Sequence, residues 1–192
     1  MRRVAAIPGR PGGHPVAGQD RDRRYGGTPT GSTPTATSTP SAATGSAAPT
    51  HAGAIGLVDI SAVAVHPAAA GVGEVLNTYF SGINDKDFAR ATSVFDPAGV
   101  IDPNDPKQVA EVARDDSTST VTGVVVRRIA TEPTVAGALA VTATFRSTQA
   151  AGFGPHGRES ETCTEWTVTY TMTSSADTYL ILRGSGASEQ CA

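Results

Sequence analysis

The spacing of apolar residues changes near Ser119, and this change restricts the class of fold that the chain can adopt. Before that point, apolar residues recur at the period of an α-helix that is buried on one face. After it, they alternate with polar residues, which is the period of a half-buried β-strand. Helices followed by strands predict an α+β domain in which about three N-terminal helices pack on a curved antiparallel sheet of four or more strands.

The clearest helix prediction covers residues 68–87, "AAAGVGEVLNTYFSGINDKD". Its larger apolar side chains all fall on one face of a helix. They are Val72, Val75, Leu76, Tyr79, Phe80 and Ile83. This segment therefore predicts an amphipathic helix that is buried along one side.

Two shorter helices are expected after it. Asp85 or Asp87 can cap the first of them, and Asp105 followed by Pro106 is a typical start for the second. The proline-rich stretch between the two helices leaves room only for a short strand at residues 100–101.

Four later stretches alternate apolar and polar residues and predict strands. They are residues 120–130, 138–147, 162–172 and 178–184. The last two are expected to form a hairpin that turns near Ser175 and Ala176, so that paired residue numbers add up to about 351.

The two cysteines, Cys163 and Cys191, could be core thiols, half of a metal site or a disulfide. The expected hairpin places Cys163 opposite about residue 188, with Cys191 only three residues further on. This proximity favours a disulfide that fastens the end of the chain to the sheet. Such bonds are rare in the cytosol.

The chain divides into three parts by composition. Residues 1–26 form a basic tail with six basic and two acidic residues, and residues 27–52 are a Gly-, Ala-, Ser-, Thr- and Pro-rich linker; both are expected to be disordered. Residues 53–192 hold nine basic and sixteen acidic residues and nearly all of the large apolar side chains, so the folded domain is expected there. Its net negative charge argues against binding nucleic acid.

Linker and cysteines together favour an extracytoplasmic location, although a generic cytoplasmic linker has a similar composition. The first residues carry no recognisable export signal, and no apolar run is long enough to span a membrane. We therefore expect a secreted protein, or one anchored through a segment that this sequence does not include.

The helical half, "VLNTYFSGINDKDFARATSVFDPAGVIDPND", resembles the opening of NTF2-like domains, and "CTEWTVTYTM" resembles extracytoplasmic versions of that fold from high-GC bacteria. The resemblance covers roughly residues 57–192 and implies a conical module with a cavity between helices and sheet. Such domains include isomerases and dehydratases, and also non-catalytic binding and dimerising modules. The catalytic pattern of the steroid-isomerase members has no match in this sequence.

"GFGPHG" at residues 152–157 matches the glycine pattern of a dinucleotide-binding loop. That motif needs a helix to begin at the glycines, whereas a strand follows here, so the segment predicts a loop between antiparallel strands. Asp102 and Asp105 are better explained by turn and cap chemistry than by calcium binding, and no histidine has other ligands at zinc spacing. We therefore expect neither a metal site nor a cofactor.

Five residues are the candidates for lining a cavity, namely Tyr79, Asp96, Arg127, Trp166 and Tyr170. If the domain is an enzyme, Asp96 or Asp102 near the rim could act as a base, while packing in the core is the favoured role of the aromatic residues. The sequence favours a non-catalytic module that binds a small ligand, an envelope component or a protein, with a homodimer as one possibility. The alternative is a small-molecule isomerase or dehydratase.

Overall fold

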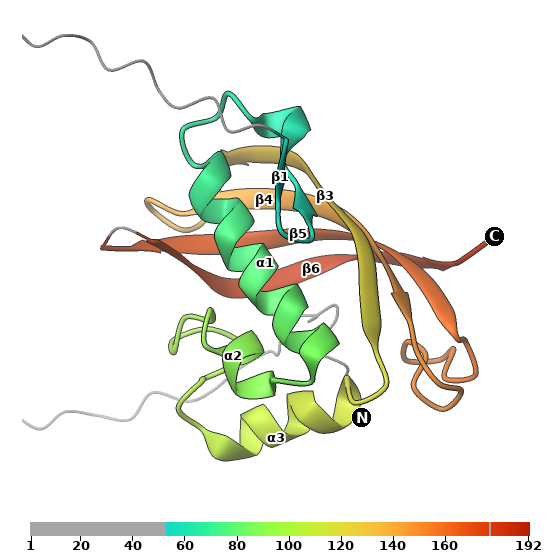
Figure 1. Ribbon diagram of the computed structural model, residues 1–192. Coiled ribbons are helices and arrows are strands. Elements are labelled where there is room, and N and C mark those ends of the chain that lie inside the picture. The colour runs from blue at the N-terminus through green and yellow to red at the C-terminus, as the bar shows by residue number, and fades with distance from the viewer. Residues whose placement is uncertain (1–52, 177) are drawn as a thin grey trace, which may run out of the picture. The chain divides into compact units, whose positions relative to one another are not determined.

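The computed structural model describes residues 53–176 and 178–192, which form an α+β domain. Helix α1 crosses one face of a six-stranded sheet, and the shorter helices α2 and α3 are grouped beside its C-terminal end (Figure 1). The predicted tail and linker, residues 1–26 and 27–52, lie outside the described residues.

The sheet follows chain order, from β1 at one edge to β6 at the other. Its long strands are β3 (Thr120–Thr131), β4 (Leu139–Thr148), β5 (Cys163–Ser175) and β6 (Thr178–Gln190). They pair antiparallel in succession, as the alternating pattern predicts. Strand β6 continues six residues beyond the predicted segment, although its last part is poor in large apolar residues.

Two short strands precede the helices, so the prediction that all helices come before the strands is wrong. β1 (Ala54–Ile55) and β2 (Val58–Asp59) form a small hairpin, which a 3-10 helix (Ser61–Val63) follows. β2 pairs in parallel with β3, so the sheet is mostly rather than wholly antiparallel, and the helices lie between strands. The strands are too short for their periodicity to be recognised in the sequence.

Helix α1 (Ala69–Asp85) buries the face that its spacing predicts. All six of its larger apolar side chains are at most 4% exposed. They pack against the helix-facing side chains of the sheet, which include Val126, Val141, Phe145 and Val168. This contact forms the core of the domain.

The two shorter helices begin at the aspartates that the sequence singles out. Asp87 accepts a hydrogen bond from the backbone N–H of Arg90 at the start of α2 (Phe88–Thr92). Asp105 accepts one from Lys107 at the start of α3 (Pro106–Asp115). In both cases the side chain satisfies a backbone donor that the first helical turn leaves unpaired.

The predicted strand at residues 100–101 is wrong, because the connection between α2 and α3 contacts the sheet in another way. Phe95 forms an isolated parallel bridge with Ile181, and the backbone N–H of Val100 donates to the carbonyl of Leu182 at 2.9 Å. The segment 94–100 therefore covers one end of the outer edge of β6.

The β5–β6 hairpin turns about where the sequence predicts, but its register differs. Ser175 pairs with Thr178, and a β-bulge near Thr171 shifts the pairing by one further residue. Cys163 consequently lies beside Cys191 rather than opposite residue 188, and the predicted disulfide is confirmed, with a Cα–Cα distance of 5.5 Å.

Gly82 allows α1 and α2 to approach closely. A Cβ at this position would lie 2.6 Å from the backbone nitrogen of Ala91. We expect Gly82→Ala to lower the free energy of unfolding by about 1–3 kcal/mol, because the helices would have to separate. Urea unfolding measures this change.

Gly71→Ala is the matched control in the same helix. Its Cβ would meet only the ring edge of Tyr179 at 3.0 Å, a side chain that can shift. Its better helix propensity should keep the unfolding free energy equal to or above that of the wild type. Equal losses in the two variants would contradict the close-approach explanation.

Candidate functional site

The space between helices and sheet, where the resemblance implies a cavity, is almost filled. A pocket of only about 20 Å³ remains there, which is room for about a single water molecule. A chain of aromatic rings fills the rest, with centroid distances of 4.8–6.1 Å between neighbours. The rings belong to Phe95, Tyr79, Phe80, Phe145 and Trp166.

Polar groups nevertheless surround this small pocket. Tyr79, Asp116, Ser147 and Gln149 line it together with Trp166. Burial raises the pKa of the Tyr79 phenol well above its ordinary value, with further contributions from Tyr170 and Asp116. The phenol is therefore neutral at physiological pH and suited to donating a hydrogen bond.

Tyr170 is also buried, but it is not among the residues that line the pocket. Its hydroxyl makes no hydrogen bond within the part of the chain that the structure describes. Burial and the nearby Asp116 raise the pKa of Tyr170. Both tyrosines are thus neutral phenols inside the core.

A larger, open groove lies on the side of the sheet away from α1. Its volume is about 580 Å³, and its lining is mainly polar. Arg127 and Arg146 lie on the β3–β4 side, and Glu165 and Glu189 lie on the β5–β6 side. The groove therefore offers cations along one wall and anions along the other.

Charges in the groove are partly paired. Arg146 forms an ion pair with Glu165 on the neighbouring strand at 2.6 Å, with both side chains about half exposed. Arg127 donates from Nε to the hydroxyl of Thr144 at 3.1 Å. Glu189 lies directly opposite Glu165 in the β5–β6 pairing, an arrangement that is unfavourable for two like charges.

The five predicted cavity residues are thus distributed over separate places. Tyr79 and Trp166 meet at the small internal pocket, and Tyr170 is buried nearby in the core. Arg127 lies in the open groove, and Trp166 is also among the residues that line this groove. Asp96 belongs to the segment between α2 and α3 and lines neither space.

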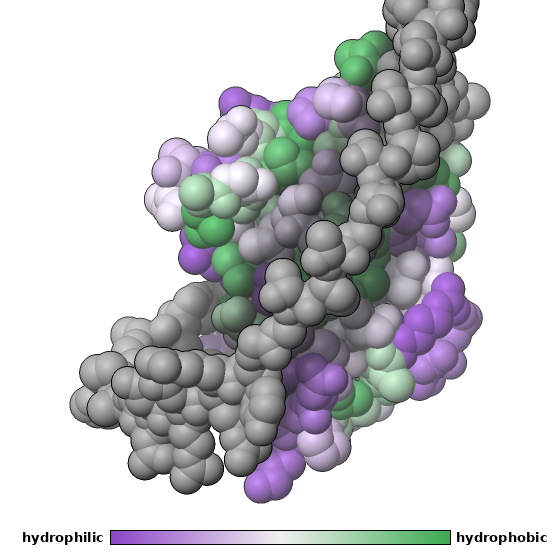
Figure 2. Space-filling model, turned by 90° about the vertical axis from the view of Figure 1, so that its left-hand side faces the viewer, coloured by the Kyte–Doolittle hydropathy of each residue, from purple (hydrophilic) through white to green (hydrophobic). Residues whose placement is uncertain are grey.

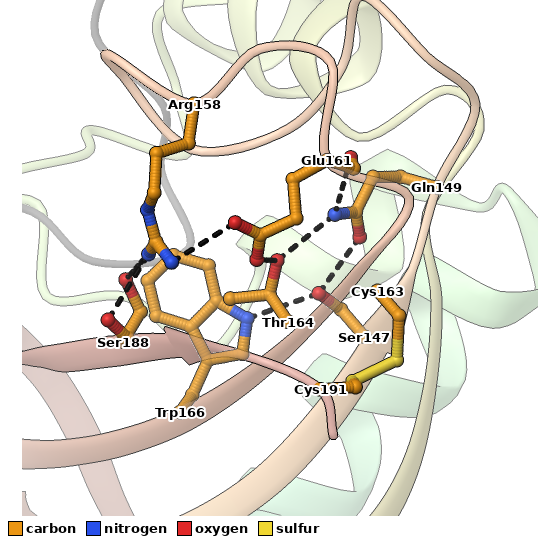
Figure 3. Close-up of polar contacts among 9 residues, drawn as sticks. All are labelled: Ser147, Gln149, Arg158, Glu161, Cys163, Thr164, Trp166, Ser188 and Cys191. Carbon is orange, nitrogen blue, oxygen red and sulfur yellow. Dashed lines mark hydrogen bonds and ion pairs between the residues drawn. A yellow bond between two sulfur atoms is a disulfide. The ribbon is translucent and has the colours of Figure 1, made fainter.

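A buried polar network, which the sequence did not reveal, fixes the loop between β4 and β5 (Figure 3). The indole N–H of Trp166 donates to Ser147, whose hydroxyl donates to Gln149. Gln149 donates to Thr164, and Thr164 donates to the carboxylate of Glu161. The side chains of Trp166, Ser147, Gln149, Thr164 and Glu161 therefore satisfy one another's hydrogen bonds.

The network ends at an ion pair that joins the loop to β6. The carboxylate of Glu161, only 4% exposed, accepts from Arg158 at 2.9 Å. Arg158 also donates to the backbone carbonyl of Ser188 at 3.0 Å and contacts its hydroxyl (Figure 3). The Cys163–Cys191 disulfide lies beside this group, so loop, β5 and β6 are fastened together at one end of the sheet.

The "GFGPHG" segment lies in this loop, and no helix begins there, as expected. The backbone N–H of Gly154 donates to the carbonyl of Glu159 at 3.0 Å. Pro155 is buried and closes one side of the internal pocket. The glycines of this segment therefore belong to a tight loop, and this loop covers one side of the internal pocket through Pro155.

Removing the disulfide should destabilise the domain by about 3.5 kcal/mol according to the chain-entropy model, because Cys163 and Cys191 are 28 residues apart. We expect the double variant Cys163→Ser/Cys191→Ser to remain folded but to unfold at lower urea concentration. The single tryptophan, Trp166, provides the fluorescence signal. An unchanged midpoint would show that the polar network alone fastens the chain end.

Asp96 gives a pH-dependent prediction. Hydrogen bonds from Thr173 (2.7 Å) and from the backbone of Ala98 lower the pKa of its carboxyl below 3.8. A lowered pKa stabilises the folded state above the unfolded pKa, and this stabilisation is lost as the pH falls through the folded pKa. We expect Asp96→Asn to be less stable than the wild type near pH 7, with the difference shrinking as the pH falls below about 3.8 and vanishing only below the lowered pKa of the folded state.

Thr173→Val provides the control, because it removes the largest cause of the shift while leaving the carboxylate in place. Thermal unfolding between pH 2 and 7 should show a smaller pH dependence for this variant than for the wild type. A difference between Asp96→Asn and the wild type that persists unchanged at low pH would contradict the assignment.

Within the described residues, the structure has neither a helix that could span a membrane nor a cluster of candidate metal ligands. No helix among them has both the length and the apolar character that crossing a membrane requires. Within residues 53–176 and 178–192, no group of three or more His, Cys, Asp or Glu side chains lies close enough together to hold a metal ion.

Comparison with known proteins gives only distant likenesses. No family model matches the sequence, and no curated protein matches it. A ketosteroid isomerase-like protein from Erwinia carotovora atroseptica aligns over 66% of this chain and 98% of its own, with 14% identity and a TM-score of 0.45.

Two further solved structures give similar values. A Xanthomonas campestris protein described as a calcium/calmodulin dependent protein kinase II association domain aligns over 63% of this chain and 87% of its own, with 8% identity and a TM-score of 0.44. Bd1075 of Bdellovibrio bacteriovorus has 14% identity over 62% of this chain and a TM-score of 0.43, and the alignment spans only 41% of Bd1075. At these values the class of fold rests on the strand order and helix placement described above.

Proposed function

We propose that this protein is an extracytoplasmic, non-catalytic binding module of the NTF2-like type, and that the open groove on the helix-free side of the sheet is its binding surface. The observation that carries this proposal is the contrast between the two spaces. The internal pocket of about 20 Å³ has no room for a substrate, whereas the groove of about 580 Å³ is open to solvent.

The chemistry of the groove indicates the kind of partner. Arginines along one wall and glutamates along the other, with threonine hydroxyls between them, suit an extended polar partner that carries charges of both signs. A protein segment or a charged polymer of the cell envelope has this character. A nucleic acid does not, because the glutamates would repel its phosphates.

The extracytoplasmic location is supported by the disulfide. Bonds of this kind persist in oxidising compartments and are rare in the cytosol. Cys163 and Cys191 form a structural bond here, since it fastens the end of β6 to β5.

Arginine variants test the groove. We expect Arg127→Ala and Arg146→Ala to weaken binding to a cell-envelope fraction of the source organism by about 10- to 100-fold, the usual cost of losing a hydrogen bond to a charged group. Co-sedimentation of the purified protein with the fraction measures this binding. Arg128→Ala is the matched control, because Arg128 is the exposed neighbour of Arg127 on β3 but does not line the groove.

An isomerase or dehydratase is the second candidate, favoured by the neutral phenol of Tyr79 beside Asp116 at the internal pocket. Such an enzyme would need the pocket to open, because Pro155 and the aromatic rings now fill it. Native mass spectrometry of protein from its own source distinguishes the candidates. A bound mass lost in Tyr79→Phe but retained in Arg127→Ala would favour the enzyme and contradict the groove.

A further inference from the structure

Three Asp–Pro peptide bonds lie in the connection between α2 and α3 and at the start of α3. They follow Asp96, Asp102 and Asp105, and the sequence contains no other Asp–Pro bond. Such a bond is broken more easily in acid than other peptide bonds. The reason is that the aspartate carboxyl can attack its own backbone carbonyl, and that the proline nitrogen is a good leaving group.

The three aspartates share one local geometry. In each of them, the carboxyl oxygen Oδ1 accepts a hydrogen bond from the backbone N–H two residues later, at 2.9 Å. This Asx turn keeps the carboxyl beside the backbone that follows it. The aspartates differ in what contacts the second oxygen, Oδ2.

Other side chains hold two of these second oxygens. Oδ2 of Asp96 accepts a hydrogen bond from the hydroxyl of Thr173 at 2.7 Å. Oδ2 of Asp105 accepts one from the amide of Gln108 at 3.1 Å. Within the described part of the chain, Oδ2 of Asp102 accepts none. This oxygen of Asp102 is therefore available to attack a carbonyl.

The backbone carbonyl of Asp102 is also prepared for attack. It accepts a hydrogen bond from the backbone N–H of Asp105 at 3.0 Å, across a turn that contains Pro103 and Asn104. A donor at this place stabilises the negative charge that develops on the oxygen when the carbonyl carbon is attacked. Asp102 and Pro103 are partly exposed and Asn104 is exposed, so water reaches the turn.

We propose that the folded protein cleaves its own backbone between Asp102 and Pro103. Oδ2 of Asp102 forms a bond to the backbone carbonyl carbon of the same residue. The bond from that carbon to the nitrogen of Pro103 breaks, and this nitrogen takes up a proton from the solution. Water then hydrolyses the cyclic anhydride that remains on Asp102. The products are a chain that ends with Asp102 and a chain that begins with Pro103, so the net reaction is the hydrolysis of a peptide bond.

The charges around the other two aspartates agree with this choice of bond. The hydrogen bond from Thr173 is the largest cause that lowers the pKa of Asp96. Hydrogen bonds from Lys107 and Gln108 lower the pKa of Asp105, to which the charge of Lys107 also contributes. Hydrogen bonds that lower a pKa stabilise the carboxylate, and a stabilised carboxylate is a weaker nucleophile.

The two products are expected to stay together through the core. The first keeps α1, whose apolar face packs on the sheet, and the second keeps β3 to β6 with the disulfide. Cleavage therefore gives a nicked protein whose two chains separate only when it unfolds. The proposal does not depend on what the groove binds.

Incubation in acid tests the proposal. We expect the native protein, kept at about pH 4 near the ordinary pKa of aspartate, to give products of residues 1–102 and 103–192 in intact-mass spectrometry. Asp102→Asn and Pro103→Ala should each abolish these products, because one lacks the attacking carboxyl and the other lacks the proline leaving group. Asp105→Asn, which can still cap α3, is the matched control and should be cleaved like the wild type. Circular dichroism at the same pH shows whether each variant is folded.

Thr173→Val tests the role of the second oxygen. This change frees Oδ2 of Asp96, whose backbone carbonyl already accepts the N–H of Gly99 at 2.8 Å. Cleavage after Asp96 should become about tenfold faster or more, the factor that corresponds to losing a hydrogen bond to a charged group. Cleavage after Asp102 should be unchanged. In urea, where these contacts are lost, all three bonds should be cleaved at similar rates.

Three results would overturn the proposal. One is a native protein that stays intact while the urea-unfolded chain is cleaved. The second is cleavage of the native wild type after Asp96 or Asp105 at the same rate as after Asp102. The third is cleavage after residue 102 that persists in both Asp102→Asn and Pro103→Ala, which would assign it to a contaminating protease.

Discussion

The contact between the apolar face of α1 and the helix-facing side of the sheet determines the rest of this structure. Tyr79 and Phe80 of the helix meet Phe95, Phe145 and Trp166 in one continuous series of rings. Large aromatic side chains bury much apolar surface, so this contact stabilises the domain. It also fills most of the space between helices and sheet, and for this reason our proposal places the binding surface outside the core. Hydrophilic and hydrophobic residues are interspersed on the face that Figure 2 shows.

Polar interactions are concentrated at one end of the sheet, where the aromatic core ends. There the disulfide, the Arg158–Glu161 ion pair and the hydrogen bonds of Gln149 fasten the β4–β5 loop and the end of β6 to β5. A glycine- and serine-rich strand gains little from burial, so fixed ends are needed to keep it extended. These contacts hold the C-terminal part of β6 against β5 and the β4–β5 loop.

Much of the fold was predictable because its signals are local. The apolar stripe of α1, the capping aspartates Asp87 and Asp105 and the alternation along β3–β6 each depend on neighbouring residues. The disulfide was predictable because a hairpin carries its register along the chain. That register was wrong by three residues, since neither the width of the turn nor the β-bulge near Thr171 has a sequence signature.

By itself, the sequence determined the class of fold, the two capped helices and the pairing of Cys163 with Cys191. Only the tertiary structure decided that β1 and β2 extend the sheet, that the internal pocket is closed and that Arg127 lies in an outer groove rather than an inner one. It also brought Glu161, Gln149 and Ser147 into one network with Trp166. The physical reason is that periodicity shows which side of an element is buried, whereas the volume left between packed side chains depends on all of them at once.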